Sequence, residues 1–253
     1  MPMNKSISNK QKEPVTYFVA DLHLSQNRTD ITDCFVSFLK NEAVYAQTLY
    51  ILGDLFESWI GDDDDSPFVE TIASALLTLK KTGTFIYYIH GNRDFLLGKE
   101  YAKRCGMALL PEVILIDLYG QQSVIMHGDT LCTRDVGYQK FRKKSRSWWW
   151  QTIIKALPLS VRRNKAANYR KQSAAATSIK SQDIMDVTAS EVVKCLEKYQ
   201  CQWLIHGHTH RPFVHDLIAN DQPAKRIVLG DWYEQGAWLK VDASGYTLMN
   251  KAF

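Results

Sequence analysis

The sequence predicts an α/β sandwich, in which two β-sheets pack face to face and helices cover their outer faces. Three observations support this fold class. Strand-like runs alternate with helix-like segments up to about residue 105, and short strands separated by Gly and Asp turns fill the region after residue 212. Alternation followed by a run of strands is typical of layered α/β domains. Polar clusters stand where the predicted strands end, which is where α/β sheets generally place their sites.

The first half of the chain supplies the alternating elements. Residues 1–14 are polar with scattered lysines, and we expect a disordered tail there. Proline at position 67 suits the first turn of a helix, and Tyr119-Gly120 suits a hairpin turn. The predicted strands are 15–20, 49–52, 84–89, 112–118 and 123–126, and the predicted helices are 32–43, 67–81 and 95–104.

The second half returns to the sheets after a long basic segment. A helix is predicted over 186–199 and a strand over 203–205. The remaining predicted strands are 212–217, 226–229, 237–241 and 246–249. No internal repeat is present, so the chain after residue 14 is expected to form one domain.

The bulk composition is that of an ordinary globular protein. At 253 residues and 45% apolar, the chain is long enough for one sizeable core. Five scattered cysteines without a Cys-x-x-Cys motif favour reduced thiols in a cytoplasm. The N-terminal residues lack the apolar core of a signal peptide, and no apolar run approaches the roughly 20 residues of a membrane span. We therefore expect a protein that is neither exported nor membrane-spanning.

Charge is distributed unevenly along the chain. The net charge is +4, but residues 134–180 carry 13 Lys/Arg and one acid, whereas the rest carries 18 basic and 26 acidic residues. Within this segment the cations alternate with a dense aromatic and aliphatic patch around Trp148, Trp149 and Trp150. This composition suits an anionic bilayer surface and an acyl-chain substrate, although a charge run by itself is equally typical of a solvated helical face.

Polar clusters at the predicted strand ends supply oxygen and imidazole ligands and no thiolate. Each cluster alone is a weak signal, but the set in this order favours Mn²⁺, Fe²⁺ or Zn²⁺ with open coordination positions. Asp21 and His23 lie two apart, so on an extended chain they would face the same way. His210 and His215 fall outside this ligand spacing. The clusters are Asp21-Leu22-His23, Gly53-Asp54, Gly91-Asn92-Arg93, His127 and His206-Gly207-His208.

These residues resemble the motifs of the calcineurin-like metallophosphoesterase superfamily. The resemblance implies a two-sheet αββα sandwich around a dinuclear metal site that hydrolyses phosphate esters or anhydrides. It also implies that Asp54 bridges the two metals. One metal would take Asp21, His23, Asp54 and His208, and the other would take Asp54, Asn92, His127 and His206.

Arg93 departs from the superfamily pattern, which usually has a histidine after Gly-Asn. Arginine cannot donate a proton at neutral pH, but its planar fork grips phosphate. A leaving group that is itself a phosphate scarcely needs protonation. We therefore predict a pyrophosphate bond as the target, with Arg93 stabilising charge across the two phosphates.

A narrower resemblance, from about residue 17 to the C-terminus, is to the family of UDP-2,3-diacylglucosamine pyrophosphohydrolases of the lipid A pathway. It is carried by residues 53–62, 91–96, the tryptophans near 148, 184–187 and 206–212. The resemblance implies a pair of Mn²⁺ ions, or other divalent metals, and water attack on the α-phosphate. The implied products are UMP and 2,3-diacylglucosamine 1-phosphate (lipid X). It also implies a peripheral protein on the cytoplasmic side of a bacterial inner membrane.

In that family a helical lid covers the acyl chains, which here corresponds to an insertion at about 134–182 within a domain spanning 15–253. The resemblance implies membrane contact through the lid. We expect no nucleic-acid partner, and a monomer touching the membrane would suffice, although the sequence leaves the oligomeric state open. Thr177 stands where an asparagine is expected. The implied catalytic residues are Asn92, Arg93 and His206, and the implied substrate contacts are Asn92, Arg93, Asp135, Ser173, Thr177, Lys180 and His206.

Three alternatives remain open from the sequence. A nuclease or dinucleoside polyphosphate hydrolase of the same superfamily would use the basic segment on a phosphate backbone and show strong salt dependence. A non-catalytic scaffold would have degenerate ligand positions, and none is found. A membrane-surface binding module would keep the metal site only for structure.

Overall fold

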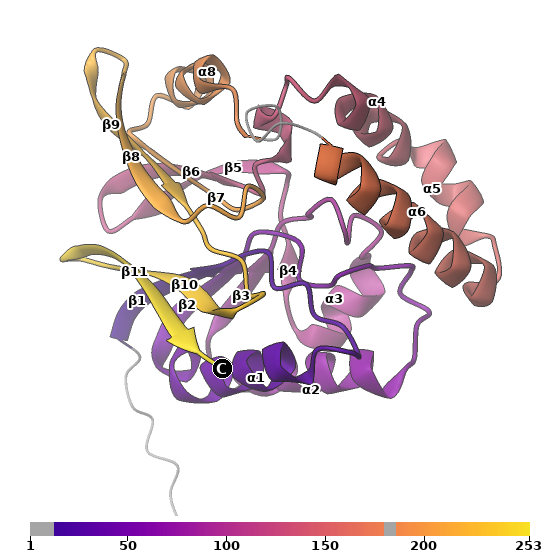
Figure 1. Ribbon diagram of the computed structural model, residues 1–253. Helices are drawn as coiled ribbons and strands as arrows, with labels where there is room; N and C mark the ends of the chain where they lie inside the picture. The colour runs from indigo at the N-terminus through magenta and orange to yellow at the C-terminus, as the bar shows by residue number, and fades with distance from the viewer. Residues whose placement is uncertain (1–12, 180–185) are drawn as a thin grey trace, which may run out of the picture.

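The computed structural model describes residues 13–179 and 186–253 and confirms the two-sheet α/β sandwich. Two twisted sheets lie face to face, with helices on their outer faces (Figure 1). Most of the predicted tail lies outside the described residues. The first strand begins at Glu13, two residues earlier than predicted.

The six-stranded sheet has the order β11-β10-β1-β2-β3-β4. Its strands β1 to β4 run parallel, and β10 and β11 add an antiparallel edge. The carboxyl ends of four parallel strands therefore meet at one edge. Their bounds are Glu13–Val19 (β1), Ala46–Ile51 (β2), Phe85–Tyr88 (β3), Ala108–Leu109 (β4), Gln235–Asp242 (β10) and Gly245–Ala252 (β11).

The five-stranded sheet has the order β5-β6-β7-β9-β8. The predicted hairpin around Tyr119-Gly120 pairs β5 with β6, and both turn residues have positive φ, of 57° and 92°. Strand β6 then pairs parallel with β7, so their carboxyl ends also lie together. The bounds are Val113–Leu118 (β5), Gln121–Met126 (β6), Trp203–His206 (β7), Phe213–Ala219 (β8) and Gln222–Val228 (β9).

Three apolar clusters hold the layers together. Residues such as Phe18, Ile125 and Leu239 fill the space between the sheets. The outer face of the six-stranded sheet is covered by α1 (Thr29–Asn41), α2 (Pro67–Lys81) and α3 (Lys99–Cys105), and α8 (Ala189–Tyr199) covers the other sheet. Two short 3-10 helices, η1 (Ala43–Tyr45) and η2 (Asp129–Leu131), complete this part of the fold.

Helix α3 begins at Lys99, whereas the sequence predicted a helix from residue 95. The reason is a distant cap. The carboxylate of Asp62 accepts the backbone N–H groups of Gly98, Glu100 and Tyr101 at 2.8–3.1 Å, so the helix starts where those donors converge. Apolar spacing alone carries no information about a cap that lies so far away in the sequence.

The basic segment folds into three helices, α4 (Val136–Ser145), α5 (Trp148–Lys155) and α6 (Leu159–Ile179). They lie together beside the sandwich (Figure 1). No helix in the described part of the chain is long and apolar enough to cross a bilayer. All five cysteines are described, and all are free thiols.

Candidate active site

The predicted metal ligands lie in the loops that follow β1, β2, β3, β6 and β7, except His206, which is the last residue of β7. Backbone hydrogen bonds tie these loops together beyond the strands. Asp21 N–H donates to the Gly53 carbonyl at 3.1 Å, and His23 N–H donates to the Asp54 carbonyl at 3.0 Å. The parallel pairing of β1 with β2 therefore continues into the loops and brings their polar side chains together.

Left-handed backbone marks the site. Nine described residues other than glycine have positive φ. Such conformations are costly for residues with a Cβ and concentrate at functional sites. Five of them are Asp21 (55°), His23 (52°), Asp54 (52°), His208 (69°) and His210 (55°). Because β1 already ends at Val19, Asp21 and His23 are brought together by this loop conformation and not by the extended chain that the sequence suggested.

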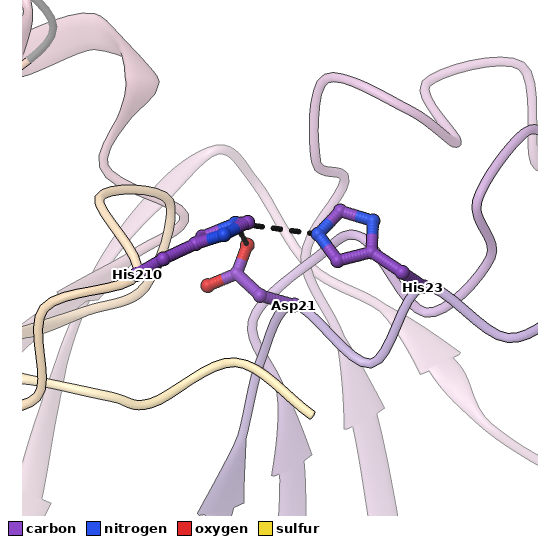
Figure 2. Close-up of side chains that lie close together, drawn as sticks. All are labelled: Asp21, His23 and His210. Carbon is purple, nitrogen blue, oxygen red and sulfur yellow. Dashed lines mark hydrogen bonds and ion pairs between the residues drawn. The ribbon is translucent and has the colours of Figure 1, made fainter. Parts of the chain in front are cut away.

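One cluster joins Asp21, His23 and His210, whose side chains point toward one another (Figure 2). His23 Nε2 lies 3.2 Å from His210 Nε2, which in turn lies 3.6 Å from Asp21 Oδ1. The Asp21 Oδ1 atom is buried and makes no conventional hydrogen bond within the described chain. A buried carboxylate oxygen facing two imidazoles in this way is a fitting place for a cation.

A second cluster joins Asp54, Asn92, His127 and His208. The Asn92 Oδ1 atom lies 2.9 Å from His127 Nε2 and 2.8 Å from His208 Nδ1. Asp54 Oδ1 is 3.9 Å from His127 Nε2, while its Oδ2 is 4.0 Å from His23 Nε2. Asp54 therefore lies between the two clusters, with one oxygen toward each.

The three histidines of residues 206–210 have different surroundings. His206 is fully buried at the end of β7, where its Nδ1 contacts the Gly207 carbonyl at 2.7 Å, and its Nε2 is buried without a hydrogen-bond partner in the described chain. Neither His206 nor His208 belongs to the tight histidine and carboxylate groups found among the described residues. His210, which spacing had excluded, joins Asp21 and His23. His208 and His210 both have left-handed backbone, and no sequence signal fixes those turns.

Burial and neighbouring charges perturb the ionisation of these groups. Burial would raise the pKa of Asp21, but His210 and the other imidazoles hold it well below its usual range. Burial raises the pKa of Asp54 in spite of His127 and His23. Burial, with His127 nearby, lowers the pKa of His208 to about 3, so its imidazole is neutral at pH 7. Neutral imidazole is the form that binds metals.

Asp94 and Gly91 fix the geometry of the loops. The buried Asp94 carboxylate accepts the N–H of Leu55 at 2.7 Å and of Gly91 at 3.0 Å, which joins the loops after β2 and β3. A Cβ on Gly91 would lie 2.1 Å from Asp54 Oδ1, so only glycine fits there. The sequence pattern did not predict this role for Asp94.

The site opens into a cavity of about 1000 Å³ between the sandwich and the three helices. Asp54, Asn92 and Arg93 line it together with further polar side chains such as Glu57 and Lys165, and aromatic and aliphatic side chains supply much of the remaining surface. The apolar lining residues include Phe95, Tyr138, Phe141, Trp150, Ile154 and Tyr169. The cavity thus combines a polar end with an apolar body.

The predicted substrate contacts are only partly described. Asp135 and Ser173 line the cavity, and the Asp135 side chain also accepts the Tyr138 N–H at 3.0 Å as the cap of α4. Thr177 lies in α6, but its side chain is outside the described part, as is Lys180. Arg93 donates its backbone N–H to Asp54 Oδ1 at 2.8 Å, and its side chain reaches the cavity.

A sequence profile of the calcineurin-like phosphoesterases matches residues 15–212, which span both polar clusters. The chain belongs to this family. Membership of this family implies that the chain binds divalent metal ions. The carboxylate, amide and imidazole groups of the site are suitable ligands for such ions.

Among characterised calcineurin-like phosphoesterases, the chain is similar to two curated enterobacterial proteins. A UDP-2,3-diacylglucosamine hydrolase of Escherichia coli O7:K1 is 54% identical over 94% of this chain and 99% of its own length. The same values hold for the UDP-2,3-diacylglucosamine hydrolase of Escherichia fergusonii. Among solved structures, Vacuolar Protein Sorting 29 from Cryptosporidium parvum is 10% identical, with 96% of this chain and 99% of that chain covered and a TM-score of 0.49.

Arginines in or next to α4 and in α6 anchor the basic segment to the phosphoesterase sandwich. Five of the six arginines between 134 and 179 form ion pairs with acidic side chains outside the segment, whereas the six lysines there are exposed and pair with no described residue. Arginine suits this role because its fork makes several directed hydrogen bonds. The paired arginines are Arg142, Arg146, Arg162, Arg163 and Arg170.

Helix α4 and the first turn of α6 contact different parts of the sandwich. At α4, Arg142 Nε donates to the buried Asp129 carboxylate at 2.7 Å, and Arg146 Nη2 donates to the Gly91 carbonyl at 2.9 Å. At α6, Arg162 is 4% exposed and donates to the Ile60 carbonyl and to Asp63, both at 2.7 Å. The acidic turn after Gly61 is therefore a docking site for α6.

Proposed function

We propose that this phosphoesterase hydrolyses the pyrophosphate bond of UDP-2,3-diacylglucosamine, giving UMP and 2,3-diacylglucosamine 1-phosphate. The observation that carries the proposal is the cavity, which joins two buried carboxylate and imidazole clusters to an aromatic chamber. A phosphate ester or anhydride fits the polar end and acyl chains fit the apolar body. The name of the 54% identical relatives supports this substrate.

Two divalent cations, Mn²⁺ in our proposal, would activate water and stabilise charge on the phosphoryl oxygens. Asp54 would serve both sites, because its two oxygens face different clusters. The remaining ligands would be Asp21, His23 and His210 for one site, and Asn92, His127 and His208 for the other. His206 stays a proposed ligand, because its buried Nε2 has no hydrogen-bond partner in the described chain, and the geometry adds His210 to the set.

Arg93 would hold the substrate phosphates. Its backbone N–H is fixed on Asp54, so the guanidinium stays beside the carboxylate that would serve both metal sites. Its Nε is buried without a conventional hydrogen bond in the described chain, which leaves a donor for phosphate oxygens. A phosphate leaving group needs charge stabilisation more than a proton, and a permanent cation provides it.

The three helices would act as a lid over the acyl chains, with Asp135, Ser173, Thr177 and Lys180 on the substrate. The outer face of α5 supports docking on an anionic membrane surface. Trp148, Trp149 and Ile153 are 79%, 45% and 58% exposed, and the unpaired lysines surround them in sequence. Exposed aromatic groups beside cations suit the headgroup region of a bilayer.

The test of the proposed function is UMP release from UDP-2,3-diacylglucosamine by the full chain, with and without Mn²⁺. We expect release that needs Mn²⁺ and falls by at least about 100-fold in Asp54→Ala. Activity on a generic phosphodiester or on nucleic acid, with none on the lipid nucleotide, would refute the substrate and favour a nuclease.

A second measurement tests the two histidines. His210→Ala should weaken Mn²⁺ binding by at least about tenfold in calorimetry, because it removes a ligand of the Asp21–His23 cluster. His206→Ala should also weaken Mn²⁺ binding, because the buried Nε2 of His206 has no other partner in the described chain. An unchanged affinity in either variant would exclude that histidine as a ligand.

Membrane docking has its own test. A Trp148→Ala/Trp149→Ala variant should bind vesicles containing phosphatidylglycerol more weakly than the wild type in a flotation assay, with its thermal midpoint unchanged. Equal binding of the two proteins would contradict docking through α5.

A further inference from the structure

Glu57 stands between the lid and the metal site. It follows Asp54 by three residues in the loop after β2. Its Oε2 atom lies 3.1 Å from His23 Nδ1, and its Oε1 accepts from Arg170 Nη2 on α6. The Glu57 and Arg170 side chains are 30% and 24% exposed, so this contact is partly shielded from water. One carboxylate thus contacts a candidate metal ligand and a lid helix.

The orientation of the His23 ring depends on this contact. One face stacks on Tyr233 at 4.9 Å and 4°, and Nε2 faces His210 and Asp54. The remaining nitrogen, Nδ1, lies 3.1 Å from Glu57 Oε2, which is ion-pair distance, and neither atom makes a conventional hydrogen bond in the described chain. A carboxylate on the far nitrogen of a ligating histidine fixes its tautomer and raises its basicity.

The position of α6 over the cavity depends on the same carboxylate. Arg162 anchors the first turn of α6 at Asp63 and Ile60. Arg170 lies eight residues, or about 12 Å, further along the helix. It forms the ion pair nearest to Ser173, which lines the cavity. The ion pair between Arg170 and Glu57 therefore holds the second half of α6 against the sandwich.

We propose that Glu57 is a positioning residue that couples lid docking to metal binding. With Arg170 in place, the carboxylate is held against His23, and the imidazole is presented to the cation in one orientation. When α6 lifts, Glu57 loses its cationic partner and is free to leave His23. The proposal rests on the proposed function, because it takes His23 as a metal ligand. Coupling of two binding events is reciprocal, so Mn²⁺ must also tighten the docking of α6.

The first test measures Mn²⁺ affinity by calorimetry on the full chain. We expect Arg170→Gln to weaken Mn²⁺ binding by about tenfold, although residue 170 is not a ligand, and Glu57→Gln to weaken it at least as much. The matched control is Arg163→Gln on the same helix. Arg163 is 60% exposed and lies 3.8 Å from Asp64, so its loss should change the affinity by less than about twofold.

The second test measures hydrogen exchange of residues 159–179 with and without Mn²⁺. In the wild type and in Arg163→Gln, Mn²⁺ should slow exchange in α6. In Arg170→Gln and Glu57→Gln, this slowing should be lost. The double variant should bind Mn²⁺ no more weakly than Glu57→Gln alone, because both substitutions break one chain of contacts.

The coupling would be overturned if Arg170→Gln bound Mn²⁺ as tightly as the wild type, or if Mn²⁺ slowed α6 exchange equally in all variants. Either result together with normal UMP release would leave the proposed function intact. If the coupling is observed but the protein releases no UMP, only the proposed substrate is refuted. A wild type that binds no Mn²⁺ would overturn both.

Discussion

Asp94→Ala is the sharpest test of how the site is built. The wild-type carboxylate is fully buried and accepts four backbone N–H groups from two loops. Alanine removes every acceptor and supplies no substitute. The loop carrying Asp54 and the loop carrying Asn92 would then lose the group that holds them in register.

The magnitude follows from the hydrogen-bond lengths. The bonds from Leu55 and Gly91, at 2.7 and 3.0 Å, are of normal length, whereas those from Asp54 and Phe56, at 3.3 and 3.4 Å, are weak. Leaving a buried N–H without an acceptor costs about 1–3 kcal/mol. Two such groups give a loss of about 4 kcal/mol, a large part of the ~5–15 kcal/mol that stabilises a typical domain.

The assay is urea unfolding followed by circular dichroism at pH 7. The control is Asp216→Ala, the same substitution at a carboxylate that is 82% exposed and paired with Lys225. That exposed ion pair should contribute less than about 1 kcal/mol. If Asp94→Ala also cost less than about 1 kcal/mol, the buried carboxylate would not be what joins the two loops.

Three further outcomes are expected. Gly91→Ala should lower Mn²⁺-dependent hydrolysis by about 100-fold with the circular dichroism spectrum unchanged, because its Cβ would collide with Asp54; wild-type turnover would contradict this. Arg162→Met leaves the Ile60 carbonyl without its donor. It should speed hydrogen exchange in α6 but not in the six-stranded sheet. Unchanged exchange in α6 would show that other contacts hold this helix against the sandwich. Asp129 has a pKa that burial would raise but that His127 and Arg142 hold well below its usual range. Its stabilisation is therefore complete above the unfolded pKa near ~3.9 and is lost as the pH falls below it, so Asp129→Asn should be less stable than the wild type at pH 7, and the gap in unfolding free energy should narrow at pH 3. A constant gap across that range would contradict the assignment.

The sequence by itself determined the layers of this protein and the strand ends at which its polar clusters lie. Apolar runs of strand length and amphipathic spacing depend on local periodicity, and that is why the sheets, the hairpin at Tyr119-Gly120 and helix α2 were predictable. The polar clusters were predictable because parallel strands must end at one edge. Composition likewise separated the basic segment that forms α4 to α6 from the rest of the chain.

Only the tertiary structure decided which groups meet across loops. His210 lies beside Asp21 and His23 with left-handed backbone, Asp62 caps α3 from a distant loop, and Glu57 contacts both Arg170 on α6 and His23. None of these follows from spacing, because each depends on a backbone conformation or a partner that packing selects. The order of strands in the sequence puts the polar clusters at one edge of the sandwich. Which side chains become partners is decided by the folded structure, because only folding brings charged groups from distant parts of the chain into the same buried space.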